Sequence, residues 1–206
     1  MQAITDLIMY FHKGGLVMWP LLACSITVIA IAIERFIYYK SVDSGAAFAS
    51  HYCAAVRSGD FAVATELARK GSGQCAQMLA DVEAVAGGKA EKSAFLESRA
   101  GIFMATLRDK LDYLGIIVTM SPLLGLLGTI VGMIGAFSIF NVEAGAPMAI
   151  TGGIGEALIA TATGLCVAIL SLCAHSYFAH RMDNIITDME QCFSALLEAE
   201  TRRARS

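Results

Sequence analysis

Three long stretches without charge constrain this chain more than any other feature. Residues 14–33 and 113–141 contain no Asp, Glu, Lys or Arg, and residues 144–179 contain only Glu156. A bilayer core needs about 20 consecutive apolar residues per helix, and lipid offers no partner for unpaired backbone groups. Only 16% of the 206 residues are charged, well below the share usual in soluble domains. We therefore predict three membrane-spanning helices, at residues 15–38, 114–140 and 151–178.

The positive charges predict the orientation of these helices. Of the 15 Lys and Arg residues, nine lie in residues 40–112 and four follow residue 178, whereas Lys13 alone precedes the first span. The positive-inside rule then places the N-terminus outside and the large loop in the cytoplasm. The predicted fold class is an all-α integral membrane protein with a helical cytoplasmic loop and long cytoplasmic helix extensions. Its segments outside the spans are an N-terminal segment (1–14), a cytoplasmic loop (39–113), a short outer connection (141–150) and a cytoplasmic tail (179–206).

The cytoplasmic segments carry helical patterns of their own. Asp60 is placed to cap a helix that Gly71 ends, and the pattern from Lys89 onward runs into the second span without a predicted break. Beyond the third span, apolar residues recur every three or four positions at Met182, Ile185, Met189, Phe193 and Leu196. The third span is therefore predicted to continue into the cytoplasm as one helix. Its apolar face packs either on neighbouring subunits or on the loop helices of its own chain.

Small residues line one face of each of the last two spans. The stretch "PLLGLLGTIVGMIGAF" (122–137) places four glycines three or four residues apart, at Gly125, Gly128, Gly132 and Gly135. Residues at such spacing share a helix face, and small residues let membrane helices approach closely. The third span carries a similar face, made of Gly153, Ala157, Thr161, Gly164 and Ala168. The two faces predict close helix packing.

Two threonines stand on or beside these faces at similar depth. At 1.5 Å per residue, Thr129 lies roughly 16 Å, and Thr161 roughly 15 Å, from the outer end of its span. Two interpretations remain open at this point. Each hydroxyl can bond the carbonyl four residues earlier in its own helix, or the two together can form a polar constriction in an ion pathway.

Glu156 is the single charged residue within the third span. A carboxyl group inside a membrane is costly unless it is paired, protonated or in contact with water, so Glu156 is a candidate functional residue. It stands about 140° around the helix from Thr161, and the two side chains need not share one pathway. The alternative is a carboxylate that extends outward to the interface.

Other classes of function have little support. The chain has no H-E-x-x-H, G-x-S-x-G or phosphate-loop lysine motif, and its four histidines do not cluster with acids. No basic stripe points to nucleic acid. The six cysteines form no C-x-x-C pair, and we expect reduced thiols that fill apolar space. The sequence thus predicts neither an enzyme nor a cofactor or metal site.

Four motifs together carry a resemblance to a known family. "SPLLGLLGTIVGMIGAF" (121–137), "GGIGEALIATATGL" (152–165), "ERF" at the end of the first span and "GDFAVATELARK" (59–70) resemble the ExbB/TolQ branch of the MotA/TolQ/ExbB proton-channel family. The resemblance extends over the whole chain, in span number, loop size and topology. One departure is Leu170, which stands where the family often has a proline.

The resemblance implies a function and a set of partners. It implies a homopentamer in a bacterial inner membrane, with the second and third spans lining a central pore. A dimer of single-span ExbD/TolR-like partners would stand in that pore, with a TonB/TolA-like protein reaching across the periplasm. Thr129 and Thr161 match the family's pore threonines, and Glu156 matches its acid in the third span. Protons would pass a partner Asp and drive outer-membrane transport or envelope maintenance; the alternative is a membrane scaffold that assembles partners without conducting.

Overall fold

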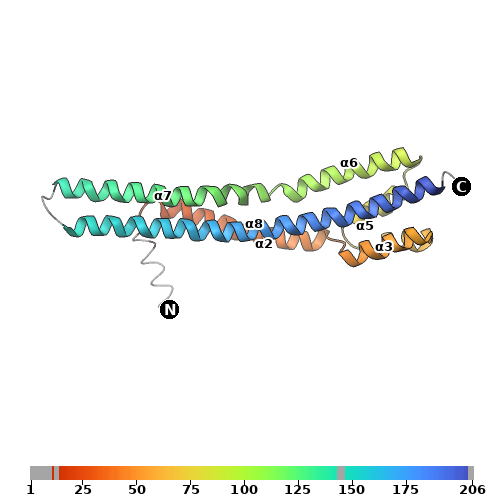
Figure 1. Ribbon diagram of the computed structural model, residues 1–206, viewed down its shortest axis with the longest axis horizontal. Coiled ribbons are helices and arrows are strands. Elements are labelled where there is room, and N and C mark those ends of the chain that lie inside the picture. Colours follow the sequence, from red (N-terminus) through yellow and green to blue (C-terminus); the bar gives the residue numbers. More distant parts are fainter. Residues whose placement is uncertain (1–10, 12–13, 143–146, 204–206) are drawn as a thin grey trace. The chain divides into compact units, whose positions relative to one another are not determined.

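The structure is a computed structural model that describes residues 11, 14–142 and 147–203 of the chain. Most of the predicted N-terminal segment 1–14 lies outside the described residues, as do residues 143–146 of the predicted outer connection 141–150. Residues 141–142 and 147–150 are helical, so the predicted connection was too long. Seven helices are described in chain order: α2 (Met18–Val42), α3 (Ala46–Ser58), α4 (Phe61–Lys70), α5 (Gln74–Glu83), α6 (Lys89–Arg108), α7 (Leu111–Val142) and α8 (Pro147–Arg203) (Figure 1). No strand occurs among the described residues, which confirms the all-α prediction.

Three of the helical stretches are long and apolar enough to cross a membrane. They contain α2, α7 and the first half of α8, so each predicted span corresponds to one helix. The third span does continue as one helix of 57 residues, as predicted. The helix continues without interruption through Leu170, the position at which the similar family often has a proline.

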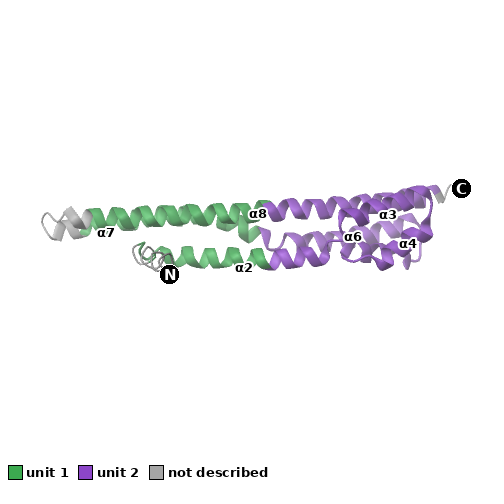
Figure 2. Ribbon diagram, turned by 90° about the horizontal axis from the view of Figure 1, so that it is seen from below, with its two compact units in different colours: residues 1–33, 112–176 green, residues 34–111, 177–206 purple. Residues whose placement is uncertain are grey.

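The chain divides into two compact units, coloured separately in Figure 2. Unit 1 comprises residues 1–33 and 112–176, and unit 2 comprises residues 34–111 and 177–206. In unit 1, α7 and α8 lie side by side, and the start of α2 packs on them through the fully buried Leu21. Leu124 of α7 and Ile159 of α8 contact this part of α2. Unit 1 therefore consists mainly of the apolar parts of the three long helices.

Unit 2 packs the short helices against the second half of α8. The apolar residues predicted along this half, Met182, Ile185, Met189, Phe193 and Leu196, are all 8% exposed or less within the single chain. Of the two alternatives left open by the sequence, packing on the chain's own loop helices therefore describes this face. An ion pair between Lys92 of α6 and Glu200 of α8, with an N–O distance of 2.8 Å, joins two elements far apart in sequence.

The predicted start and end of α4 are confirmed. The side chain of Asp60 accepts a hydrogen bond from the backbone N–H of Val63, at 3.2 Å. At the other end, the N–H of Gly71 donates to the carbonyl of Leu67 at 2.8 Å. A carboxylate that accepts an otherwise unpaired N–H of the first turn is the usual reason for Asp at this position.

The expectation of a helix unbroken from Lys89 into the second span is wrong. The helix ends at Arg108, residues 109 and 110 form a turn, and α7 begins at Leu111. The buried residues of α6 are Leu96, Ala100, Phe103 and Leu107, whereas Ile102 is 66% exposed.

Two side chains of α2 explain the break. Arg35, only 4% exposed, donates from Nη1 to the carbonyl of Thr106 at 3.0 Å. The hydroxyl of Tyr39 donates to the carbonyl of Leu107 at 2.9 Å. In an unbroken helix these carbonyls would accept the N–H groups of residues 110 and 111. Because side-chain donors satisfy them instead, α6 can end here without leaving buried carbonyls unpaired.

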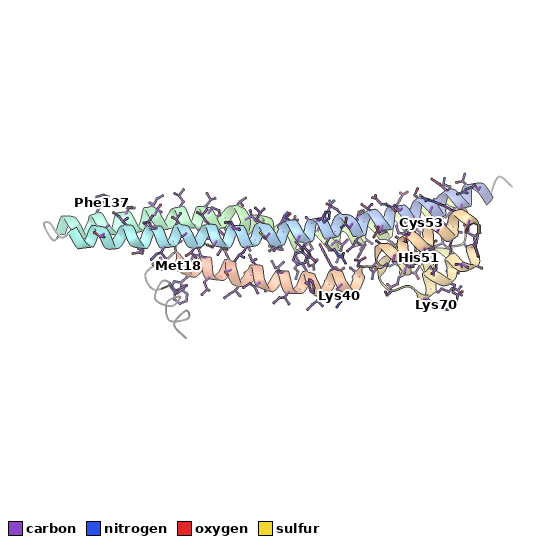
Figure 3. All side chains as sticks on the ribbon, turned by 60° about the horizontal axis from the view of Figure 1, so that its bottom comes forward. Met18, Lys40, His51, Cys53, Lys70 and Phe137 are labelled. Atoms are coloured by element: carbon purple, nitrogen blue, oxygen red, sulfur yellow. The ribbon has the colours of Figure 1, made fainter. Side chains whose placement is uncertain are left out.

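Three buried cysteines lie in unit 2, outside the predicted spans. They are Cys53 of α3, labelled in Figure 3, Cys75 of α5 and Cys192 of α8. Burial raises the pKa of the Cys53 thiol to about 11. A hydrogen bond with Cys75, and then burial, raise the pKa of the Cys192 thiol. The thiols of Cys53 and Cys192 are therefore protonated at neutral pH, and a protonated buried thiol is a weak nucleophile.

Candidate ion pathway in the paired helices

Glycines bring the backbones of α7 and α8 into close approach. A Cβ added at Gly132 would stand 2.9 Å from the carbonyl oxygen of Gly153, and one at Gly128 would stand 2.5 Å from the Cβ of Ala160. From the α8 side, a Cβ at Gly164 would stand 2.6 Å from the carbonyl oxygen of Ser121. All three distances are shorter than real Cβ contacts, so a larger residue would push the two helices apart. This is the small-residue packing typical of membrane helices.

Gly125 and Thr161 meet within this contact. The Thr161 hydroxyl lies 3.1 Å from the carbonyl oxygen of Gly125 in α7 and 3.1 Å from that of Ala157 in α8. Its single proton is shared between a bond along its own helix and a bond across the helix pair. Thr161 is partly buried, and its oxygen keeps acceptor capacity for a further donor.

The contact face of α7 differs from the predicted one at its outer end. A Cβ at Gly135 would meet no described residue within 4 Å, whereas Ala136 lies against Gly153. The face thus follows Gly125, Gly128, Gly132 and Ala136. Gly135 falls beside this line because the step from 132 to the next contact is four residues, not three.

Thr129 has a more local environment. Its hydroxyl donates to the carbonyl of Leu126, three residues earlier in α7, at 2.6 Å. The α8 contacts of Gly125 and Gly132 bracket it, so Thr129 lies about one turn from the level of Thr161. The predicted similar depth therefore holds only to within about one helical turn, and of the two threonines only Thr161 bonds across the helix pair.

Glu156 faces another part of unit 1. Its carboxylate lies against Gly15, three residues before α2 begins, where an added Cβ would overlap Oε1. Gly15 has a φ of 72°, the left-handed region that favours glycine. Thr161 faces α7 and Glu156 faces the start of α2, so a single chain does not bring these two candidates together.

Two buried serines were missed by the sequence analysis. Ser121 and Ser171 are both fully buried. The Ser171 hydroxyl of α8 donates to the carbonyl of Leu114 in α7 at 2.9 Å, whereas Ser121 Oγ has no partner among the described residues. Both extend the small-residue faces by one step, Ser121 four residues before Gly125 and Ser171 three after Ala168. The spacing was therefore a signal that could have found them.

Comparison with known proteins agrees with this architecture. The profile of the MotA/TolQ/ExbB proton channel family matches residues 72–191, more than half of the chain. The chain belongs to this family. Together with the three helices that could cross a membrane, membership makes it a multi-pass inner-membrane protein of the ExbB/TolQ branch.

Individual relatives are similar over different shares of their length. The chain is 34% identical over 170 residues to the ExbB-like 1 protein of Synechocystis sp., covering 79% of this chain and 66% of the relative. It is 27% identical to the biopolymer transport protein exbB1 of Vibrio cholerae, covering 85% and 80%. For the Tol-Pal system protein TolQ of Haemophilus influenzae the identity is 33%, covering 40% and 37%. The chain thus spans just under two thirds of the first relative and about a third of the last.

Proposed function

We propose that this chain is the proton-channel subunit of an inner-membrane motor that uses the proton motive force. The observation that carries the proposal is the Thr161 hydroxyl, placed inside a glycine-lined contact between two membrane helices in a member of a proton-channel family. A hydroxyl at that place is a polar step in otherwise apolar surroundings. Polar groups within spans are costly and commonly functional.

The proposed assembly is a homopentamer with α7 and α8 facing a central pore. The N-terminus lies outside, and the loop and tail, which hold most Lys and Arg residues, lie in the cytoplasm. A dimer of single-span ExbD/TolR-like partners occupies the pore and carries the proton-binding Asp. A TonB/TolA-like protein transmits the work across the periplasm, for outer-membrane transport or envelope maintenance.

The chemistry proposed for Thr161 follows from its hydrogen bonds. The hydroxyl donates its proton to a backbone carbonyl, at 3.1 Å from either of two acceptors. Its free lone pairs then accept a hydrogen bond from water or from a protonated partner carboxyl. Thr129 supplies a second such acceptor about one turn away. Glu156, at the Gly15 turn, would act nearer the outer end.

The ion is proposed to be H⁺. Within the three predicted spans Glu156 is the single carboxylate apart from Glu34 at the inner end of the first. Hard cations such as Na⁺ are held by several oxygen ligands, commonly including carboxylates. A carboxyl carrier on the partner serves a proton without further ligands from this chain.

The test is proton flux in liposomes that contain the full-length chain and an ExbD/TolR-like single-span partner. Thr161→Val keeps the shape and removes the hydroxyl, and Thr161→Ser keeps the hydroxyl. A hydrogen bond between neutral groups is worth about 0.5–1.5 kcal/mol, or roughly twofold to tenfold in rate. We expect Thr161→Val to lose flux by that factor and Thr161→Ser to keep most of it.

Thr163 provides a matched control on the same helix. Its hydroxyl donates at 2.8 Å to the carbonyl of Ile159, four residues earlier, and bonds to no described residue of α7. Thr163→Val should leave flux unchanged. Equal flux in Thr161→Val and Thr161→Ser, with normal protein level, would contradict the proposed role and favour the non-conducting scaffold.

A further inference from the structure

A cavity of about 320 Å³ lies in unit 2 beside the end of α2. It is lined by three residues of α2 and three of α8: Phe36, Tyr39, Lys40, Tyr177, Phe178 and Arg181. Four of these side chains are aromatic and two are cationic. None of them takes part in the threonine site or the glycine contact of unit 1.

The aromatic rings form one wall of this cavity. Tyr39 and Phe178 meet edge to face with centroids 5.7 Å apart, and Phe178 meets Tyr177 likewise at 5.2 Å. Tyr39 and Phe178 are buried, whereas Phe36 and Tyr177 are 56% and 55% exposed. Ring packing therefore holds the buried rings of Tyr39 and Phe178 in place, and the exposed rings of Phe36 and Tyr177 present apolar surface to the surroundings.

The two cations differ in what they already bind. Arg181 Nη2 lies 2.7 Å from Oδ2 of Asp43. Burial and the charge of Asp43 raise the pKa of the nearby Asp188, and the charge of Arg181 opposes this rise. The ion pair with Asp43 leaves other N–H donors of the guanidinium available. Lys40, exposed at the end of α2 (Figure 3), makes no ion pair or hydrogen bond with the described part of the chain. The cavity thus offers an unpaired ammonium group and part of a guanidinium to an anion.

The position of the cavity along the helices indicates which kind of anion it binds. Residues 36–40 end the first predicted span, 15–38, and residues 177–181 end the third, 151–178. Both lie at the side assigned to the cytoplasm by the positive charges. Aromatic belts and basic pockets between helices at that interface fit lipid headgroups of the inner leaflet.

We propose that this cavity binds the headgroup of an acidic glycerophospholipid from the cytoplasmic leaflet. Lys40 and Arg181 hold the phosphate, and the exposed rings of Phe36 and Tyr177 contact the glycerol and the first acyl carbons. The proposal depends on the positions of the span ends and not on ion conduction. Occupancy of the site would then depend on the fraction of acidic lipid in the membrane.

The test is lipid binding to the detergent-purified full-length protein, measured by native mass spectrometry. Phosphatidylglycerol and phosphatidylcholine with the same acyl chains are titrated separately. We expect wild-type protein to bind phosphatidylglycerol more tightly. One Lys near the membrane surface contributes a factor of about five in affinity for anionic lipid, so Lys40→Gln should lose about that factor and leave phosphatidylcholine binding unchanged.

Lys70→Gln is the matched control. Lys70 also lies in unit 2, is 77% exposed, and pairs with Glu66 on α4, far along the chain from the cavity. Equal binding of the two lipids, or the same loss in Lys70→Gln and Lys40→Gln, would overturn the proposal. So would displacement of phosphatidylglycerol by an equal concentration of glycerol 3-phosphate, which would indicate a soluble anion. Lys40→Arg keeps the charge and should retain the preference for phosphatidylglycerol. Loss of that preference in Lys40→Arg would also contradict the proposal.

Discussion

Buried hydroxyl groups in the α7–α8 contact differ in whether they find an acceptor. Ser171 donates across the pair to the carbonyl of Leu114, and Thr161 donates across it to Gly125. Ser121, equally buried, has no partner in the part of the chain that the structure describes. In lipid, an unmade hydrogen bond is not recovered from water. The two serines therefore have similar burial and opposite energetic roles.

This contrast gives a prediction for the pair of serine variants. Ser171→Ala removes a hydrogen bond between helices, which in membrane proteins contributes about 0.6 kcal/mol and at most about 1.7 kcal/mol. Ser121→Ala removes a polar atom that has no partner, so it should be neutral or slightly stabilising. The measurement is the unfolding of purified protein with increasing SDS, followed by circular dichroism. Equal destabilisation of both variants would show that Ser121 has an acceptor after all.

At the scale of helices, glycine is required only where a backbone faces it. Gly132 faces the carbonyl of Gly153, whereas Gly135, three residues later on the same helix, has nothing within 4 Å in the part of the chain that the structure describes. Both have ordinary helical backbone conformations, since neither is among the glycines with positive φ. Packing, not conformation, therefore distinguishes these two positions.

We predict opposite effects of the same substitution at these two glycines. Gly132→Ala places a Cβ 2.9 Å from a backbone oxygen, and overpacking of this kind costs about 1–3 kcal/mol. Gly135→Ala meets open space within the chain and improves helix propensity by up to about 1 kcal/mol. The same SDS titration measures both. If Gly135→Ala weakens only the oligomer, Gly135 lies at a contact between subunits; equal losses in the two variants would contradict the helix pairing described here.

Most helices, and the faces of the long ones, could be predicted from sequence because hydrophobic periodicity and capping residues are local signals. The spans, the cap at Asp60 and the cytoplasmic continuation of α8 were predicted in this way. The break after Arg108 could not be, because its cause is distant in sequence. Arg35 and Tyr39 lie about 70 residues earlier and act only once α2 packs beside α6.

The candidate site was predictable to the same extent. Spacing placed Thr161 on the small-residue face of α8, but it could not say which carbonyl its hydroxyl would bond. The register of the outer contact, where Ala136 replaces Gly135, depends on how the two helices cross. The direction of Glu156 toward Gly15 likewise depends on the position of α2, which no local pattern encodes.

In the described part of the single chain, one long apolar face of α7 is exposed. Its large residues are between 40% and 64% exposed: Leu123, Leu126, Leu127, Ile130, Val131, Ile134 and Phe137. Within a bilayer such residues contact either lipid or neighbouring subunits, since lipid tails are as apolar as leucine. The proposed pentamer assigns part of this face to neighbouring copies of α7 and α8.

We therefore predict that the chain assembles without the partner. If contacts between copies of α7 and α8 hold the ring, the chain expressed alone should form it, because these contacts need no residue of the partner. Native mass spectrometry of the detergent-purified protein should show five copies. Gly132→Leu, whose side chain separates α7 from α8, should insert in the membrane and lose this species. A stable monomer or dimer of the wild-type chain at high concentration would contradict the pentamer and leave the exposed face of α7 to lipid.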